Sequence, residues 1–180
     1  MTGLQIFGVP GLPEIVEGTD LAAAILASAA AAGTPLADGD VVVVTSKIVS
    51  KAEGRTVELD QVVPSPFAVE WSAQWEKDPA VTEIVLRESK RVVRQIGPIL
   101  ITETHHGFVC ANSGVDQSSS GAHGRAVLLP VDPDASARAI RSGLKAGGVD
   151  AAIIISDTFG RAWREGQTDI AIGVAGIQPI

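Results

Sequence analysis

The chain has 180 residues, which suits one domain or two small packed lobes and is enough to bury a core. Apolar residues make up 46% of it and charged residues 19%, a balance that excludes wholesale disorder. Fourteen Lys and Arg against 21 Asp and Glu give a net charge of -7, so no broad positive field attracts nucleic acid. An anionic small molecule would need a metal ion or a few well-placed cations.

The cysteine count, the first residues and the length of the apolar stretches indicate the compartment and the relation to membranes. Cys110 is the single cysteine, so no internal disulfide forms, and the first residues lack the basic start and apolar run of a secretion signal. The longest apolar stretches, 21–32 and 151–155, are shorter than the roughly 20 residues that cross a bilayer. We therefore expect a cytoplasmic protein with no membrane partner.

The first half of the chain predicts alternating strands and helices. Residues 4–9 are expected to form a short strand, and Thr19 or Asp20 can cap an alanine-rich helix that Gly33 ends near residue 32. Four valines at 41–44 are typical of a strand buried on both faces. A weaker strand is expected over 55–59.

Two aspartate-proline pairs mark helix starts in the second half. Asp78 and Asp132 each precede a proline and predict helices over 79–88 and 133–145. Residues 99–102 and 107–110 predict a hairpin, and 117–124 an exposed or ligand-ordered loop. Strands are expected at 151–156 and from Thr168 onward.

The order of these elements decides the expected architecture. Strands and helices interleave irregularly, which favours a mixed α+β fold over a regular doubly wound sheet, with two intimately packed lobes as one form of it. One domain is expected over 1–180. Because the last apolar strand reaches Ile180 without a cap or a polar tail, we expect this domain to be incomplete at its C-terminal end.

A polar, glycine-punctuated stretch from Asp157 to Asp169 separates the last two expected strands. A carboxylate at the end of a buried strand, followed by the hydroxyl of Thr158, suits Mg²⁺ or Mn²⁺, which prefer oxygen ligands. A turn capped by Asp157 through the local backbone explains the pattern equally well. Arg161 and Arg164 carry the fork that matches phosphate or carboxylate, although single arginines are more often solvated.

Asp116 is the second candidate metal ligand, because it also follows a strand and precedes a hydroxyl-rich loop. Judged alone, an aspartate that merely orders the polyserine loop is the favoured alternative. Lys47 and Lys51 lie four residues apart, on one side of either a strand or a helix, and could bind phosphates. Solubilising lysines at a strand exit are the plainer explanation, and no Walker-type loop is present.

Other chemistries find no support in the sequence. The three histidines, at 105, 106 and 123, do not have the spacing of metal ligands. Cys110 lies in an apolar strand without a second cysteine, which predicts a buried, inert thiol. No nucleophile elbow supports a Ser-His-Asp triad.

The order of the motifs resembles the coenzyme F420-0:gamma-glutamyl ligases. The resemblance covers nearly all of the chain and is most specific over 157–168, DTFGRAWREGQT. Further matching segments are GLPE at 11–14, TSKIVSKAEGR at 45–55, ESK at 88–90, HGFVCANSGVD at 106–116 and LLPVDPD at 128–134.

This resemblance implies GTP-dependent addition of L-glutamate to F420-0 through an acyl phosphate, followed by γ-linked glutamates. Mg²⁺ or Mn²⁺ is the implied cofactor, with K⁺ as a further candidate, and the implied assembly is a homodimer. The matching nucleotide positions are Leu12, Pro13, Glu14, Ile15, Ser46, Lys51 and Ser119, and the matching metal positions are Asp116, Asp157 and Thr158. Lys47, Arg161 and Arg164 remain candidates for phosphate or substrate contacts.

Two departures from the family pattern qualify these expectations. Ser119 stands where the family commonly has asparagine, which changes the donors offered to a nucleotide. The family's ligase region also continues beyond residue 180, in agreement with the expected incompleteness. A metal-dependent phosphohydrolase and a non-catalytic nucleotide-binding module are the alternative functions.

Overall fold

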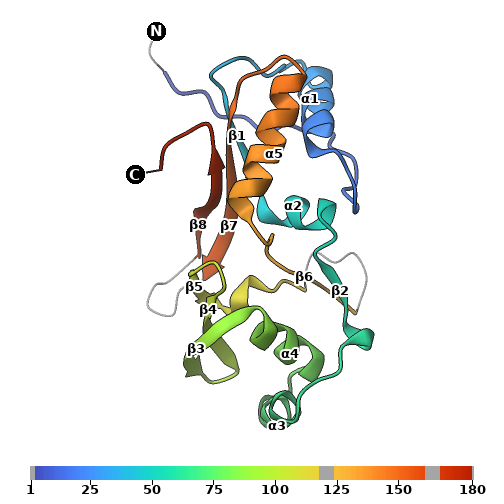
Figure 1. The fold of residues 1–180 in the computed structure, drawn as a ribbon, viewed down its shortest axis with the longest axis vertical. Helices are drawn as coiled ribbons and strands as arrows, with labels where there is room; N and C mark the ends of the chain where they lie inside the picture. The colour runs from blue at the N-terminus through green and yellow to red at the C-terminus, as the bar shows by residue number, and fades with distance from the viewer. Residues whose placement is uncertain (1–2, 118–123, 161–166, 180) are drawn as a thin grey trace.

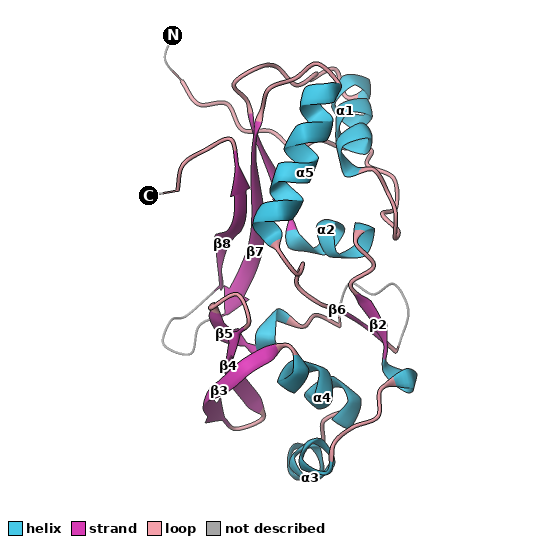
Figure 2. Ribbon diagram, viewed as in Figure 1, coloured by secondary structure: helices cyan, strands magenta, loops and turns pink. Residues whose placement is uncertain are grey.

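The computed structural model describes residues 3–117, 124–160 and 167–179 (Figure 1). Within these ranges helices and strands alternate irregularly, which confirms the mixed α+β fold (Figure 2). The helices are α1 (Leu21–Ala31), α2 (Ser46–Ala52), α3 (Pro66–Trp75), α4 (Pro79–Arg87) and α5 (Pro133–Ala146), with short 3-10 turns η1 (Leu59–Gln61) and η2 (Asn112–Gly114). The strands are β1 (Val41–Thr45), β2 (Thr56–Glu58), β3 (Ser89–Ile96), β4 (Ile99–Thr104), β5 (Val109–Ala111), β6 (Arg125–Val127), β7 (Ala152–Gly160) and β8 (Gln167–Ala175).

One part of the molecule is built on a three-stranded sheet with the order β1-β7-β8. Strands β1 and β7 run parallel, and β8 runs antiparallel to β7. Helices α1 and α5 lie together over one face of this sheet (Figure 1). The largest apolar core fills the space between them, around Ile140, Leu144, Ile153 and Ile155. This core fixes the position of β7, which carries Asp157.

The other part contains an antiparallel sheet of order β3-β4-β5, the pair β2-β6 and helices α3 and α4. Two smaller apolar clusters lie here, one around Leu59 and Ile84 and the other around Trp71 and Leu100. These clusters are separate from the main core. The chain therefore has two packed lobes, one built on the β1-β7-β8 sheet and one on the β3-β4-β5 sheet, which is one of the forms expected from the sequence. Helix α2 lies between the two parts in Figure 1.

The predicted helix starts are confirmed by their caps. The carboxylates of Asp20, Asp78 and Asp132 accept hydrogen bonds from backbone N–H groups of the first turns of α1, α4 and α5. Proline follows at the first position of α4 and α5, where its missing N–H costs no helical hydrogen bond. Local capping therefore sets where these helices begin.

Three expectations about strands were wrong or incomplete. Residues 4–9 form no strand among the described residues, and Leu4 and Ile6 are 87% and 86% exposed, because no sheet edge pairs with them. Helices cover one face of the sheet, so Val42 and Val44 are the better-buried residues of β1, and Val41 and Val43 on the other face are half-exposed rather than buried. Strand β7 continues beyond residue 156 because β8 pairs with it as far as Gly160.

The described residues hold no helix with both the length and the apolar character that a membrane crossing requires.

Candidate functional site

Asp157 and Ser46 meet because they follow the same edge of the parallel pair β1 and β7. Thr45, the last residue of β1, pairs with Ser156, so the next residue of each segment lies beyond that register. The hydroxyl of Ser46 donates a hydrogen bond to Oδ1 of Asp157. The sheet therefore brings a carboxylate and a hydroxyl together across 111 residues of sequence.

Asp116 belongs to the other lobe and lies close enough to Asp157 for the two charges to interact. Its backbone exchanges hydrogen bonds with Val127, with N···O distances of 2.9 and 2.8 Å. Just before it, Ser113 has a positive φ of 53° and is 98% buried, where its N–H donates to Thr102 and its hydroxyl donates to the carbonyl of Val85. This buried polar network fixes the turn that presents Asp116.

Lys47 connects the two lobes at this point. Its ammonium lies 2.7 Å from Oδ2 of Asp116, and it follows Ser46 directly on α2. The side chains are 43% and 26% exposed, so water partly screens the pair. One helix thus gives a hydroxyl to Asp157 and a cation to Asp116.

The electrostatics of the pair favour a bound cation. Burial raises the pKa of the Asp157 carboxyl, and the negative charge of Asp116 raises it further. The hydroxyl of Ser46, the ammonium of Lys47 and the backbone N–H of Thr158 act in the opposite direction. Two carboxylates close enough to repel are a suitable donor set for Mg²⁺ or Mn²⁺, so these residues fit the expected metal. In the described ranges no larger group of acidic, His or Cys side chains could hold a metal ion.

The hydroxyl of Thr158 has a different carboxylate partner from Asp116 and Asp157. Successive side chains of a strand point to opposite faces, and the hydroxyl of Thr158 donates to Oδ1 of Asp169 on β8 instead. A metal ligand role for Thr158 stays a prediction, and Asp169 is a neighbour that the sequence interpretation did not single out. The register of β7 and β8 is the feature that reveals it. Ser119, Arg161 and Arg164 lie outside the described residues.

A cavity of about 270 Å³ brings together three of the expected nucleotide positions, Glu14, Ile15 and Lys51. Ile15 is buried in the main core, which anchors the segment, and the N–H of Gly18 donates to the carbonyl of Ala52 at 2.8 Å. Leu12 and Pro13 lie next to this segment and do not line the cavity. The seven-residue helix α2 has Ser46 and Lys47 at one end and Lys51 near the other, so it links this cavity to the carboxylate pair.

The same cavity contains charged residues that the sequence interpretation missed. Glu17, Glu58 and Arg125 contribute to its lining, and Arg125 lies 2.5 Å from Glu58 across the β2-β6 pair. Gly54 has a φ of +69°, and a Cβ atom there would lie 2.7 Å from the carboxylate carbon of Glu17. The missing side chain of Gly54 therefore makes room for this carboxylate. No local sequence signal joins residues 14–17, 51–58 and 125.

Cys110 has the buried environment that the sequence predicted, and His106 lies in the turn between β4 and β5. The thiol is buried, and that burial, together with the charge of Asp157, raises the pKa of Cys110 to about 12. His106 donates through Nε2 to the carbonyl of Pro130 at 2.8 Å and stacks on Phe108 at a centroid distance of 5.9 Å. Both residues support the β4-β5 hairpin behind the carboxylates.

Carboxylates that converge beside a lysine, next to a cavity with further charged groups, are compatible with an enzyme that binds a divalent cation and phosphate groups. The family is more specific. Residues 11–180 match the model described as F420-0:Gamma-glutamyl ligase, and the chain belongs to this ligase family.

Individual relatives agree with the family assignment. A protein named coenzyme F420:L-glutamate ligase from Methanothermobacter thermautotrophicus is 44% identical over 179 residues, which cover 99% of this chain and 71% of the relative. A protein of the same name from Methanopyrus kandleri is 45% identical over 97% of this chain and 67% of the relative. A third, from Methanocaldococcus jannaschii, is 44% identical over 79% of this chain and 57% of the relative.

Proposed function

We propose that this chain carries a GTP-dependent coenzyme F420-0:L-glutamate ligase activity. The observation that carries the proposal is the convergence of Asp116 and Asp157, with Lys47 between the lobes, in a member of this family. The names of the relatives supply the acceptor and the amino acid. GTP, the divalent metal and the acyl phosphate come from the resemblance of the motifs, and the site is compatible with all three.

The proposed reaction has two steps. An oxygen of the acceptor carboxylate attacks the γ-phosphorus of GTP and GDP leaves, which gives an acyl phosphate. The amine of L-glutamate then attacks the acyl carbon, phosphate leaves, and the nitrogen loses a proton to give the amide. Each step needs charge neutralisation and alignment rather than a protein nucleophile, in agreement with the inert environment of Cys110.

Residues of the carboxylate site and of the neighbouring cavity have separate roles in the proposed reaction. Asp116 and Asp157 would hold the divalent ion, which when bound polarises the phosphate oxygens. Lys47 would add a positive charge to the transferred phosphoryl group, and Ser46 holds the Asp157 carboxylate through its hydrogen bond. The cavity at Glu14, Ile15 and Lys51 would bind the nucleotide, with Lys51 on its phosphates.

Product analysis tests the reaction. The protein is incubated with GTP, Mn²⁺, F420-0 and L-glutamate, and GDP and the glutamylated product are quantified by chromatography and mass spectrometry. We expect GDP only when acceptor and glutamate are both present. GDP release that needs neither would identify a phosphohydrolase, and nucleotide binding without any turnover would identify a binding module.

Matched variants test the site. Asp116→Asn and Asp157→Asn should each lower turnover by about 100-fold or more, since each removes a charge expected on the metal. Glu70→Asn is the control, because this exposed carboxylate of α3 lies outside the site. Full activity of both aspartate variants would contradict the proposal.

We also propose a cytoplasmic homodimer. The one cysteine is free and buried, which suits a reducing compartment, and the exposed valines of edge strand β1 offer an apolar surface. Light scattering on the purified protein tests the assembly, and a Val43→Lys variant should shift it toward the monomer. A monomeric wild type would contradict this part.

A further inference from the structure

A second cavity, of about 520 Å³, lies between α5 and the end of β8. Arg138, Arg141 and Lys145 line it from the helix, and their spacing of three and four residues places them along one side of α5. Val174 and Ile177 line it from the other wall. Among the residues that the structure describes, the lining includes no Asp or Glu, although the whole chain has a net charge of -7.

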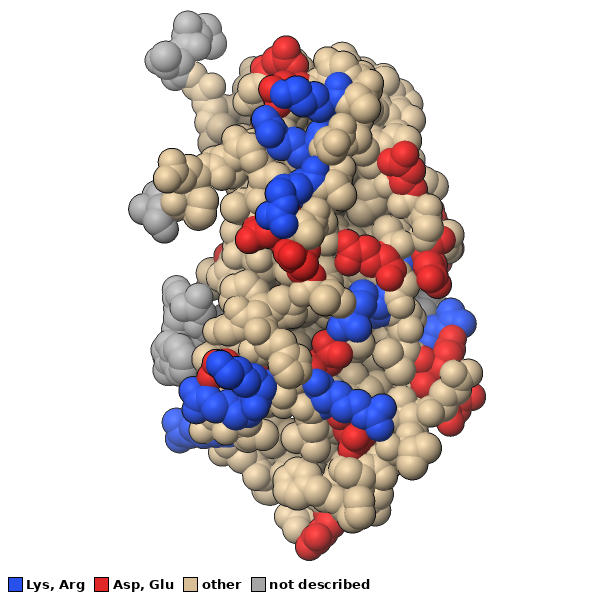
Figure 3. All heavy atoms as spheres, in the orientation of Figure 1, with Lys and Arg blue, Asp and Glu red and all other residues tan. Residues whose placement is uncertain are grey.

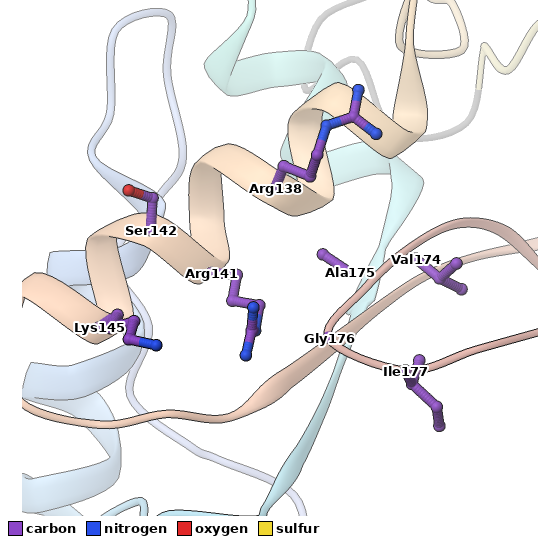
Figure 4. Close-up of a pocket in the computed structure, with 8 residues that line it drawn as sticks. All are labelled: Arg138, Arg141, Ser142, Lys145, Val174, Ala175, Gly176 and Ile177. Carbon is purple, nitrogen blue, oxygen red and sulfur yellow. The ribbon is translucent and has the colours of Figure 1, made fainter.

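Arg141 is held in place within this cavity. In Figure 4 it extends from α5 toward the segment that carries Gly176, while Arg138 leaves the same helix in another direction. Its Nε donates to the carbonyl of Ala151 at 3.2 Å. Gly176 has a φ of +75°, and a Cβ there would come within 2.4 Å of that Nε atom. The glycine therefore leaves room for a fixed guanidinium.

The surrounding carboxylates only partly neutralise the three cations. Asp150 forms ion pairs with two of them, at 2.5 Å from Arg141 and 3.1 Å from Lys145. Asp132 is 3.9 Å from Arg138 and also caps α5. Asp134 accepts from the N–H of Val174 at 2.8 Å. Figure 3 shows Lys and Arg in a strip over α5 with acidic side chains at its two ends.

We propose that the cavity between α5 and the end of β8 binds a small molecule with two or more carboxylate or phosphate groups. Seven residues of helix separate Arg138 from Lys145, a rise of about 10 Å, so the anionic groups should lie one to two helical turns apart. Arginine forks match both carboxylates and phosphates. Ile177, which is 44% exposed, offers contact to an apolar linker between the charged groups.

This site is distinct from the candidate catalytic site. Val174 pairs with Ile154 and Ile170 pairs with Asp157, so the two sites lie about 10 Å apart along β7. The cavity is near the start of β7, and Asp157 lies three residues further along the strand than Ile154. The lining of the cavity includes none of Ser46, Lys47, Asp116 and Asp157, so a variant of the cavity keeps the residues of the candidate catalytic site.

Calorimetric titration of the full chain tests the proposal with two probes in separate experiments, inorganic tripolyphosphate and tri-γ-glutamate. Binding of either probe should be about tenfold weaker in Arg138→Gln/Lys145→Gln, because two charge-assisted contacts are lost. The matched control is Lys90→Gln/Arg91→Gln, which removes two exposed cations that pair with Glu103 on the β3-β4 hairpin. The control should bind within about twofold of wild type.

The Asp150→Asn variant gives an independent readout. This change removes the carboxylate that competes for Arg141 and Lys145, and binding should become about threefold tighter or more. A preference for tripolyphosphate identifies a phosphate ligand, and a preference for tri-γ-glutamate identifies a carboxylate ligand. The proposal is overturned if neither probe binds wild type, or if the Arg138/Lys145 and control variants weaken binding equally.

Discussion

The ammonium of Lys47 lies 2.7 Å from Oδ2 of Asp116, and this contact joins α2 to the turn that follows η2. Ser46, one residue earlier, donates to Asp157. Two adjacent residues of one short helix therefore contact two carboxylates that are 41 positions apart in the sequence.

Lys47 and a metal ion compete for the same carboxylate, so Lys47→Met should bind Mn²⁺ more tightly. A partly exposed ion pair contributes about 1 kcal/mol, which corresponds to about fivefold in affinity. Turnover should fall in the same variant, because a cation next to the phosphoryl group is lost. Calorimetry with Mn²⁺ measures the first effect, and Lys77→Met, an exposed lysine after α3, is the control. Weaker Mn²⁺ binding in Lys47→Met would exclude competition.

Gly173→Ala should destabilise the protein, because α5 begins directly against β8 at this point. A Cβ at Gly173 would lie 2.4 Å from the backbone carbon of Pro133, the first residue of α5. Overpacking of this kind costs about 1–3 kcal/mol. Gly8→Ala, with no atom within 4 Å of the new Cβ, should stay within about 0.5 kcal/mol of wild type. Urea unfolding followed by tryptophan fluorescence compares them, and equal midpoints would contradict the close approach.

Glu83 makes stability depend on pH in acid. Hydrogen bonds from the hydroxyl and backbone N–H of Ser65, together with Arg87, lower the pKa of Glu83 from 4.5 to about 2. A lowered pKa stabilises the folded state above pH 4.5, and this contribution is lost as the pH falls through about 2. Glu83→Gln should therefore be less stable than wild type at pH 6, with the difference shrinking toward pH 2.

Urea midpoints at pH 6, 4 and 2.5 measure this pH dependence. Glu70→Gln, an exposed carboxylate on α3, should follow wild type at each pH. A difference between Glu83→Gln and wild type that stays constant with pH would show that the carboxylate charge is not what stabilises this contact.

Cys110 should resist alkylation in the folded protein. With a pKa of about 12, its thiolate fraction at pH 8 is about 1000-fold below that of an unperturbed thiol, and burial blocks the reagent as well. Iodoacetamide labelling at pH 8, followed by intact mass, should be slow in buffer and fast in urea. Rapid labelling of the folded chain would mean that the β5 strand opens readily.

Local sequence was sufficient for several elements and for part of the site. Asp20, Asp78 and Asp132 predicted their helix starts because a cap depends on residues within one turn. Asp116 and Asp157 were singled out because a carboxylate after an apolar strand is visible in the sequence, and the structure brings them near each other. Thr158 was paired with Asp157 by adjacency alone, and the alternation of β7 separates the two side chains.

The sequence by itself determined the helix starts, the buried thiol and the two candidate carboxylates, because these follow from short-range patterns. Only the tertiary structure decided that β1 is an edge strand, that Lys47 reaches Asp116, and that Arg141 lies over Gly176. These relationships depend on strand order and on helix packing across more than 30 residues of sequence. Such contacts form only when the apolar cores of both lobes have set the positions of the backbone.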